Sequence, residues 1–139
     1  MLTGVACPAG WDLHGSRCFK VDATDRTGAQ AKTYCTSQGG ALASLHSLAE
    51  HNFVFGLMNA ETDAWIGIEN VNSWSDGTTW AYTKFADGEP NNAGGIQDCG
   101  YVRKKAGSTK NNGWLDMDCT STMAQTICAR EGLTNSTHI

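Results

Sequence analysis

The chain has little charge, little proline and no cluster of basic residues. Only 17% of its 139 residues are charged, two are proline, and no basic run is longer than Lys104-Lys105. With a formal net charge of −4, the sequence offers no basic patch for nucleic acid or for an anionic membrane surface. No apolar stretch reaches the roughly 18 residues that a membrane-spanning helix needs. We therefore expect neither a nucleic-acid partner nor membrane insertion.

The usual signatures of catalysis are also missing from the sequence. There is no Gly-x-Ser-x-Gly elbow, phosphate-binding loop or dinucleotide fingerprint. The four histidines are scattered, at His14, His46, His51 and His138. His46 and His51 are five residues apart, a spacing that does not bring both onto one helical face as a zinc pair would need. We expect a binding protein and not an enzyme.

What the chain does have is an apolar content of 40% and six cysteines, within the length of one ordinary domain. The cysteines stand at irregular spacings: Cys7, Cys18, Cys35, Cys99, Cys119 and Cys128. None belongs to a close Cys-x-x-Cys pair of the kind that supplies structural zinc. The alternatives are six reduced thiols in a cytosolic protein or three disulfides formed in an oxidising compartment, and the second is favoured.

The sequence leaves the connectivity of these cysteines open. If all six form disulfides, no thiol nucleophile remains. A secreted protein is made with a leader, and the residues before Cys7 lack the charged-then-apolar leader pattern. We therefore expect a secreted, extracellular protein in its mature form, with Met1 as a start residue and the leader absent from this chain.

Periodicity predicts two helices in the first half of the chain. Thr27 caps the first helix, which ends at Gly39-Gly40. Ser47 begins the second, with Glu50 completing a capping box. The apolar stripes consist of Ala31, Tyr34, Cys35, Phe53, Val54, Leu57 and Met58. These stripes are assigned to the core and not to a binding site.

The residue pattern of the second half of the chain predicts short strands around a long loop. Strands are predicted at residues 64–68, 79–82, 99–102 and 125–128. Before the helices, Cys7 and Cys18 flank a turn, as a disulfide across a small hairpin would require. The stretch 69–98 is rich in Asn, Ser, Asp and Gly, and long ordered loops on a cross-linked scaffold usually carry function. The fold class is α+β, with two helices and a mainly antiparallel sheet.

Acidic and amide residues gather at three points, residues 89–92, 97–98 and 116–118. If Cys99 pairs with Cys119, the disulfide brings these three segments to one edge of the domain. Carboxylate oxygens and amide groups suit a hard cation such as calcium, or the hydroxyl groups of a sugar. The alternative is a plain solvated polar loop.

Together these motifs resemble the C-type lectin-like domain. The matching segments are Cys7-Pro8 with Trp11, Trp65-Ile66-Gly67-Ile68, Glu89-Pro90-Asn91 and Trp114-Leu115-Asp116. The resemblance covers about residues 7–130 and implies a single domain over residues 1–139. The stretch 89–99 is similar to perlucin-like lectins of molluscs. By resemblance, the disulfides are Cys7–Cys18, Cys35–Cys128 and Cys99–Cys119.

The resemblance implies a carbohydrate-binding lectin. In this family a Glu-Pro-Asn tripeptide implies mannose-, glucose- or GlcNAc-type sugars, and Glu89 and Asn91 match it. A carboxylate accepts from one sugar hydroxyl, an amide donates to its neighbour, and both hold the calcium ion. A cis bond before Pro90 would turn the flanking side chains in one direction. Defence against microbes is a further expectation at the level of the family.

Two of the family's calcium ligands are changed in this sequence. Gln97 stands where the family usually has Glu, and Leu115 where it usually has Asn, while Asp116 matches. The auxiliary calcium position has Asn70 and Asn92 in place of carboxylates, with Trp74 nearby. Losing one carboxylate and one carbonyl would cost on the order of 10²-fold in calcium affinity or more.

We therefore expect calcium dependence to be weak or lost, with no resident cofactor favoured. If calcium does bind, its ligands would be Glu89, Asn91 and Asp116. Without it, the sugar would be held by direct hydrogen bonds to Glu89, Asn91, Gln97 and Asp116. Five aromatic side chains are candidates for stacking on a sugar ring: Trp74, Trp80, Tyr82, Tyr101 and Trp114. Trp65 and Trp114 are expected in the core.

The alternative function is a protein-binding or mineral-associated module that has lost sugar binding. Leu115 and Gln97 favour this alternative, whereas the intact segment 89–91 opposes it. Because single sugar sites bind weakly, a non-covalent homo-oligomer is expected to supply avidity. Asn135 begins an Asn-Ser-Thr sequon and is a candidate for N-glycosylation.

Overall fold

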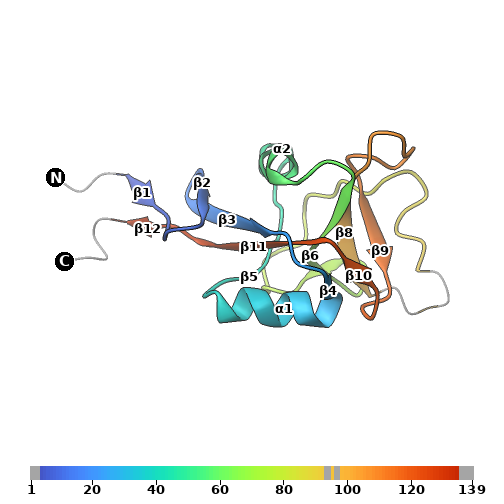
Figure 1. The fold of residues 1–139 in the computed structure, drawn as a ribbon, viewed down its shortest axis with the longest axis horizontal. Coiled ribbons are helices and arrows are strands. Elements are labelled where there is room, and N and C mark those ends of the chain that lie inside the picture. The colour runs from blue at the N-terminus through green and yellow to red at the C-terminus, as the bar shows by residue number, and fades with distance from the viewer. Residues whose placement is uncertain (1–3, 93–94, 96–97, 135–139) are drawn as a thin grey trace.

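The computed structural model describes residues 4–92, 95 and 98–134. Two helices of ten residues, α1 (Gly28–Ser37) and α2 (Leu48–Leu57), lie on either side of the central strands (Figure 1). The strands are β1 (Val5–Ala6), β2 (Asp12–His14), β3 (Arg17–Asp22), β4 (Arg26–Thr27), β5 (Ala41–Leu42), β6 (Thr62–Glu69), β7 (Ser73–Trp74), β8 (Cys99–Lys104), β9 (Trp114–Met117), β10 (Thr122–Met123), β11 (Gln125–Glu131) and β12 (Leu133–Thr134).

The main sheet runs in the order β2-β3-β11-β6-β8-β9, with β5 added to β11 and β7 to β6. Its pairings are antiparallel except for that of β11 with β6, which is parallel. The predicted α+β class with a mainly antiparallel sheet is therefore confirmed. Short β1 pairs with β12, so the first and last strands lie side by side at one end of the molecule (Figure 1).

Helix α1 begins where the sequence predicts. The hydroxyl of Thr27 accepts a hydrogen bond from the backbone N–H of Gln30 at 3.2 Å, and the Gln30 side chain accepts from the N–H of Thr27. This reciprocal pair satisfies two N–H groups that the first turn leaves without helical partners. The helix buries Ala31 and Cys35 against the sheet, as the predicted stripe requires.

Helix α2 also begins as predicted, but only half of its capping box forms. The hydroxyl of Ser47 accepts from the N–H of Glu50 at 3.1 Å. The carboxylate of Glu50 accepts from the N–H of His46 and from the guanidinium of Arg17, and does not reach back to Ser47. The ion pair with Arg17 holds the Glu50 carboxylate away from the N–H of Ser47, which accounts for this correction. Val54 lies in the core, as the stripe predicts.

The strand predicted at residues 79–82, all of which the structure describes, does not form. The rings of Trp80 and Tyr82 lie 6.3 and 5.8 Å from that of Trp114, so these residues fill space beside the core. β-propensity measures how well a side chain suits a half-buried surface, and aromatic residues in a loop can satisfy it without pairing. Among the strands that the sequence did not indicate is β9, which pairs with β8 and carries Asp116.

Three disulfides connect Cys7 to Cys18, Cys35 to Cys128 and Cys99 to Cys119, the pairing implied by the resemblance. The second joins α1 to β11, and the third joins β8 to the turn after β9. Trp65 and Trp114 are fully buried, as expected. In the part of the chain that the structure describes, no helix has the length and apolar character needed to cross a bilayer.

Candidate functional site

The long loop between β7 and β8 passes β9 at the end of the molecule opposite the termini (Figure 1). The peptide bond between Glu89 and Pro90 is cis, the form considered in the sequence analysis. Strand β9, paired with β8, presents Asp116 to the loop from the edge of the main sheet. The loop and the edge strand therefore form the frame in which the candidate site is built.

Hydrogen bonds join three of the four predicted site residues. The backbone N–H groups of Asn91 and Asn92 donate to the two carboxylate oxygens of Asp116, at 3.1 and 2.7 Å. The amide Nδ2 of Asn91 donates to Oε2 of Glu89 at 3.1 Å, and the N–H of Asp116 lies 3.4 Å from Oε1 of Glu89. The fourth predicted residue, Gln97, lies outside the described residues.

One member of this cluster, Lys110, is not predicted from the sequence. Its ammonium Nζ lies 2.5 Å from Oε2 of Glu89 and forms an ion pair with that carboxylate. The side chain of Glu89 is only 2% exposed, whereas that of Lys110 is 33% exposed. Lys110 belongs to the β8–β9 loop, and no motif or spacing in the sequence marks it. Only the folded arrangement of the two loops reveals the contact.

Among the described residues, the side-chain oxygens gathered at this site are a poor fit to a calcium ion, which takes six to eight oxygen ligands. Oε2 of Glu89 is engaged by Lys110 and Asn91, and both carboxylate oxygens of Asp116 accept backbone N–H groups. Leu115 has no side-chain oxygen and lies in the core. Within residues 4–92, 95 and 98–134, no group of three or more histidine, cysteine or acidic side chains is placed to hold a metal ion.

The structure also shows the surroundings of two residues named for the auxiliary calcium position, Asn70 and Trp74. The N–H of Asn70 donates to the backbone oxygen of Asp98 at 2.9 Å, and Trp74 is buried in the core. Asp118, which the sequence groups with the site, accepts from the N–H and the hydroxyl of Thr120 at 2.9 Å. Asp118 therefore stabilises the turn after β9 and does not join the cluster around Glu89.

A buried histidine anchors the loop that carries Lys110. The indole N–H of Trp114 donates to Nδ1 of His51 at 3.0 Å, so the proton of the neutral ring is on Nε2, which donates to Oδ1 of Asn112 at 2.7 Å. The Nζ of Lys84 donates to the backbone oxygen of Asn112. Burial lowers the pKa of His51 and the charge of Lys84 lowers it further, while the bond to Asn112 opposes both.

We expect the protein to lose stability as the pH falls below 6.5, the ordinary pKa of histidine. Because the pKa of His51 is lower in the folded state, the unfolded chain takes up the proton first. The contribution of neutral His51 to the free energy of unfolding is complete above pH 6.5 and is lost as the pH falls through the lowered pKa. Urea unfolding at pH 7.5 and 5.0 should show a smaller pH effect in His51→Gln than in the unsubstituted chain.

The matched control for this measurement is His46→Gln, which changes a partly exposed histidine next to the same helix. This control should keep the full pH effect. Equal pH effects in His51→Gln and in the unsubstituted chain would show that His51 is not the acid-sensitive group.

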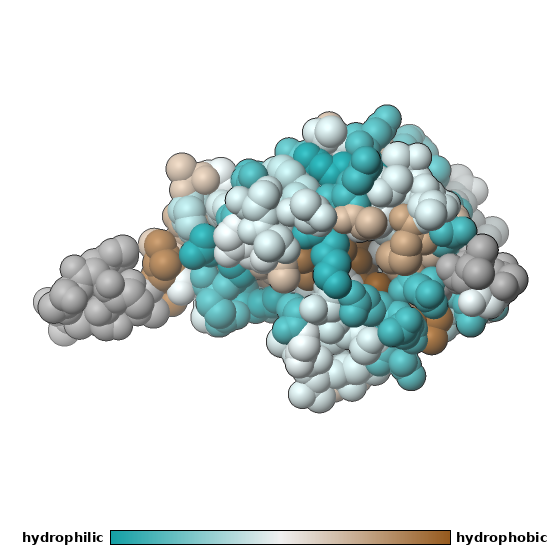
Figure 2. Space-filling model, turned by 90° about the horizontal axis from the view of Figure 1, so that it is seen from below, coloured by the Kyte–Doolittle hydropathy of each residue, from teal (hydrophilic) through white to brown (hydrophobic). Residues whose placement is uncertain are grey.

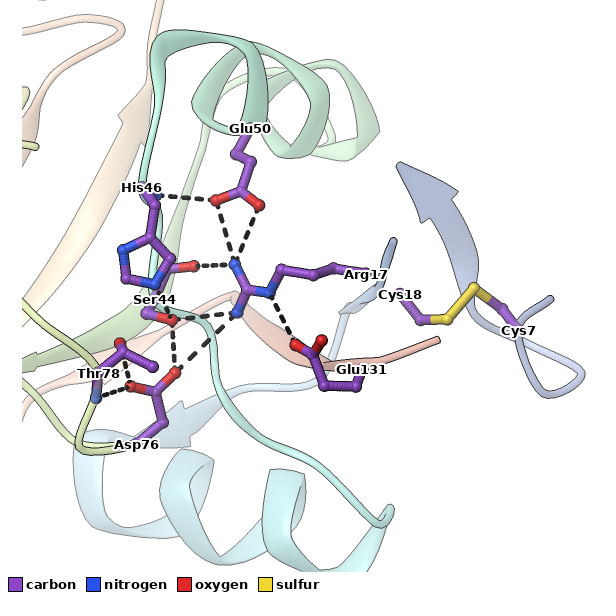
Figure 3. Close-up of polar contacts among 9 residues, drawn as sticks. All are labelled: Cys7, Arg17, Cys18, Ser44, His46, Glu50, Asp76, Thr78 and Glu131. Atoms are coloured by element: carbon purple, nitrogen blue, oxygen red, sulfur yellow. Dashed lines mark hydrogen bonds and ion pairs between the residues drawn. A yellow bond between two sulfur atoms is a disulfide. The ribbon is translucent and has the colours of Figure 1, made fainter. Parts of the chain in front are cut away.

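A second polar cluster surrounds Arg17 (Figure 3). Its guanidinium donates to the backbone oxygen of Ser44 at 2.9 Å and to Oε1 of Glu50 at 3.1 Å, and forms ion pairs with Asp76 and Glu131. These partners come from the β5–α2 connection, α2, the long loop and β11. The cluster therefore ties four separate segments to β3.

Ser44, His46 and Asp76 lie together in this cluster without forming a catalytic triad. The hydroxyl of Ser44 lies between the other two, with hydrogen bonds to Nε2 of His46 at 3.0 Å and to Asp76. A triad needs the imidazole in the middle and an accessible hydroxyl, whereas Ser44 is fully buried. Burial alone would raise the pKa of Asp76, but hydrogen bonds from Ser44 and Thr78 hold this pKa below its usual value.

A cavity of about 380 Å³ opens on the α1 side of the molecule, where Figure 2 shows apolar residues in a hollow. Leu42, Ile68 and the Cys99–Cys119 disulfide are among its lining residues. None of the site residues Glu89, Asn91, Asp116 and Lys110 lines it. We assign this cavity no part in the candidate site.

Comparison with known proteins identifies the family. Residues 24–130 match the model of the lectin C-type domain. The chain is 39% identical to the lactose-binding lectin l-2 of Anguilla japonica, over 82% of this chain and 72% of that protein. It is 35% identical to ladderlectin of Oncorhynchus mykiss over 81% of this chain, and spans 62% of the length of ladderlectin.

Solved structures agree with this match. A calcium-independent type II antifreeze protein superimposes with a TM-score of 0.83 at 32% identity, covering 94% of this chain and 98% of that one. The cow CD23 carbohydrate-recognition domain, solved in the presence of a GlcNAc2Man3 oligosaccharide, gives a TM-score of 0.81 at 26% identity, covering 92% and 98%. This chain belongs to the C-type lectin family.

Proposed function

We propose that the protein binds glycans of the mannose, glucose or GlcNAc type at the site around Glu89, Asn91 and Asp116. The observation that carries the proposal is the hydrogen-bonded unit that these residues form, with Asn91 exposed at the surface. An exposed amide group offers both donor and acceptor atoms to sugar hydroxyls. The CD23 domain solved in the presence of a GlcNAc2Man3 oligosaccharide supports a glycan of this type.

In this proposal Glu89 acts mainly by orienting other groups. Its side chain is nearly enclosed, and its Oε2 accepts from both Asn91 and Lys110. Asn91 and Lys110 therefore face the solvent as donors, while Glu89 holds them from behind. For stacking on a sugar ring, partly exposed Trp80 and Tyr82 are the remaining candidates, because Trp74, Tyr101 and Trp114 are buried.

We also propose that glycan binding does not need calcium. The carboxylates of Glu89 and Asp116 are already engaged within the protein, and Leu115 has no side-chain oxygen to offer as a ligand. The antifreeze relative described as calcium-independent supports a fold of this kind without the ion. Binding without catalysis, secretion in a disulfide-forming compartment and a non-covalent homo-oligomer are further parts of the proposal. The Asn135 sequon stays a prediction, because it lies outside the described residues.

The deciding experiment is retention of the protein on immobilised mannose, GlcNAc and lactose, each in the presence of calcium and of a chelator. We expect retention on mannose or GlcNAc under both conditions. Preferential retention on lactose would contradict the proposed sugar type and favour a specificity like that named for the lactose-binding relative. Retention abolished by the chelator would contradict calcium independence. No retention on any glycan would overturn the proposal.

Glu89→Ala is expected to weaken glycan binding roughly 10- to 100-fold, because it removes the acceptor that orients Asn91 and Lys110. Titration of a soluble mannose or GlcNAc ligand measures the change. The control is Asp25→Ala, which removes an exposed carboxylate away from the site and should bind as the unsubstituted chain does. Undiminished binding by Glu89→Ala would place the sugar elsewhere on the molecule.

The second candidate function is a protein-binding or mineral-associated module without sugar affinity. The enclosure of Glu89 favours it, since a carboxylate that is 2% exposed has little direct access to ligand. The similarity to an antifreeze protein supports it as well. The failure of every glycan column, with the protein shown to be folded, would select this alternative.

A further inference from the structure

We propose that Lys110 is a built-in cation of the glycan site. Its ammonium takes the place that a divalent ion would need beside Glu89 and donates a hydrogen bond to a sugar hydroxyl. The sugar contact rests on the proposed function, whereas the replacement of the metal ion does not.

Burial of Glu89 is the first argument for this role. A carboxylate that is only 2% exposed is separated from water, and a buried charge is tolerated only when it is paired and hydrogen-bonded. Lys110 supplies that charge at 2.5 Å, and the amide of Asn91 adds a neutral donor at 3.1 Å. The ammonium therefore stabilises the carboxylate that the family uses for calcium.

The charge balance of the cluster is the second argument. Glu89 and Asp116 each carry one negative charge and are linked through the N–H of Asp116, and Lys110 contributes one positive charge. A calcium ion that entered beside Glu89 would be repelled by this ammonium. It would also find fewer unengaged oxygens than the six to eight that it takes as ligands. Calcium binding therefore requires Lys110 to leave, which lowers the affinity for the ion.

The placement of Lys110 by its own loop is the third argument. The backbone N–H of Lys110 donates to the hydroxyl of Ser108, and its carbonyl accepts from the N–H of Gly113. Asn112, which His51 holds, lies two residues farther along the same loop. These hydrogen bonds fix the backbone of the loop, and the fixed backbone places the Lys110 side chain next to Glu89.

The Lys110 side chain is exposed enough to contact a ligand. An ammonium has three N–H donors, and the carboxylate of Glu89 engages one of them. With 33% of its side chain exposed, Lys110 presents further donors to solvent next to Asn91. An ammonium in this position can neutralise the carboxylate of Glu89 and also donate to a sugar hydroxyl.

The test is calcium binding by the full chain, measured by titration calorimetry, for the unsubstituted protein, Lys110→Met and Lys32→Met. Lys32→Met is the matched control because it removes a lysine paired with a carboxylate, that of Glu69, elsewhere on the surface. We expect Lys110→Met to bind calcium at least about 10-fold more tightly than the other two proteins. Equal calcium affinity in all three would overturn the replacement of the ion by Lys110.

The sugar contact is tested in the presence of chelator. Lys110→Met should bind the mannose or GlcNAc ligand about 10-fold more weakly, and Lys110→Arg, which keeps the charge and the donors, should recover most of the affinity. Unchanged sugar binding by Lys110→Met would overturn the contact. If the unsubstituted chain binds no glycan, the proposed function fails and the calcium titration still decides the role of Lys110.

Circular dichroism establishes that each variant is folded before the titrations. If Lys110→Met does not fold, the comparison uses Lys110→Gln, which keeps a polar side chain and removes the charge. Lys110→Gln is expected to show the same gain in calcium affinity, and the absence of this gain would count against the proposal equally.

Discussion

A variant in which both Cys35 and Cys128 are replaced by Ala should lose about 4.6 kcal/mol of unfolding free energy, much of what a domain of this size has. The two cysteines are 93 residues apart, so the disulfide removes a large loop entropy from the unfolded chain. It also joins α1 to β11, the strand that pairs with β3, β5 and β6. Guanidinium unfolding followed by tryptophan fluorescence measures the loss.

The matched control is the Cys7→Ala, Cys18→Ala variant. Its cysteines are 11 residues apart, so the same entropy relation gives a loss of about 2.8 kcal/mol. A larger loss for the long loop is the expected order. Equal losses, or the reverse order, would show that local packing around the sulfur atoms outweighs chain entropy in this protein.

The features that could be predicted correctly are either local or implied by the resemblance to a family. Thr27 and Ser47 cap their helices because a hydroxyl side chain at that position meets N–H groups within the same turn. The six cysteines pair as the resemblance implies, and the cis bond before Pro90 is present. The perlucin-like subtype stays a prediction.

The errors concern contacts between segments distant in sequence. Residues 79–82 look like a strand from their side chains, but a strand also needs a partner, and the rings pack on Trp114 instead. The spacing of Ser47 and Glu50 predicts a complete capping box, but Arg17, 33 residues away in the sequence, binds the Glu50 carboxylate instead. Propensity records the preference of a residue and not the competing partner that the fold supplies.

The candidate site shows the same division. The tripeptide 89–91 and Asp116 could be found by motif, and the structure brings them together. Lys110 could not be found, because a lysine in a polar loop matches no motif and its partner Glu89 lies 21 residues away in another loop. In the sequence His51 is one of four scattered histidines, whereas in the structure it is fully buried and bonded to Trp114 and Asn112.

Trp114→Ala is expected to lower the unfolding free energy by roughly 3–5 kcal/mol. The side chain of Trp114 is fully buried, and its ring lies 5.3 Å from that of Trp74 and 5.8 Å from that of Tyr82. Its removal leaves a cavity next to the long loop and leaves Nδ1 of His51 without the indole donor, and each effect adds to the cost. Urea unfolding at pH 7.5 measures the loss.

Trp114→Phe separates packing from hydrogen bonding. It keeps most of the ring and removes the N–H, so it should cost about 1–3 kcal/mol, the penalty for an unsatisfied buried acceptor. A loss as large as that of the alanine variant would show that the bond to His51 matters more than the volume.

The same two variants test whether the core fixes the position of the site. Trp114 lies on β9 two residues before Asp116, and through His51 it holds Asn112 in the loop that carries Lys110. The positions of Asp116 and of Lys110, the two charged groups that flank Glu89, therefore depend on Trp114. Trp114→Phe, which should stay folded, is expected to weaken glycan binding more than an equally destabilising change remote from β9, because it releases the Lys110 loop without unfolding the domain. Unchanged glycan affinity in the folded variant would mean that the loop holds its position without His51.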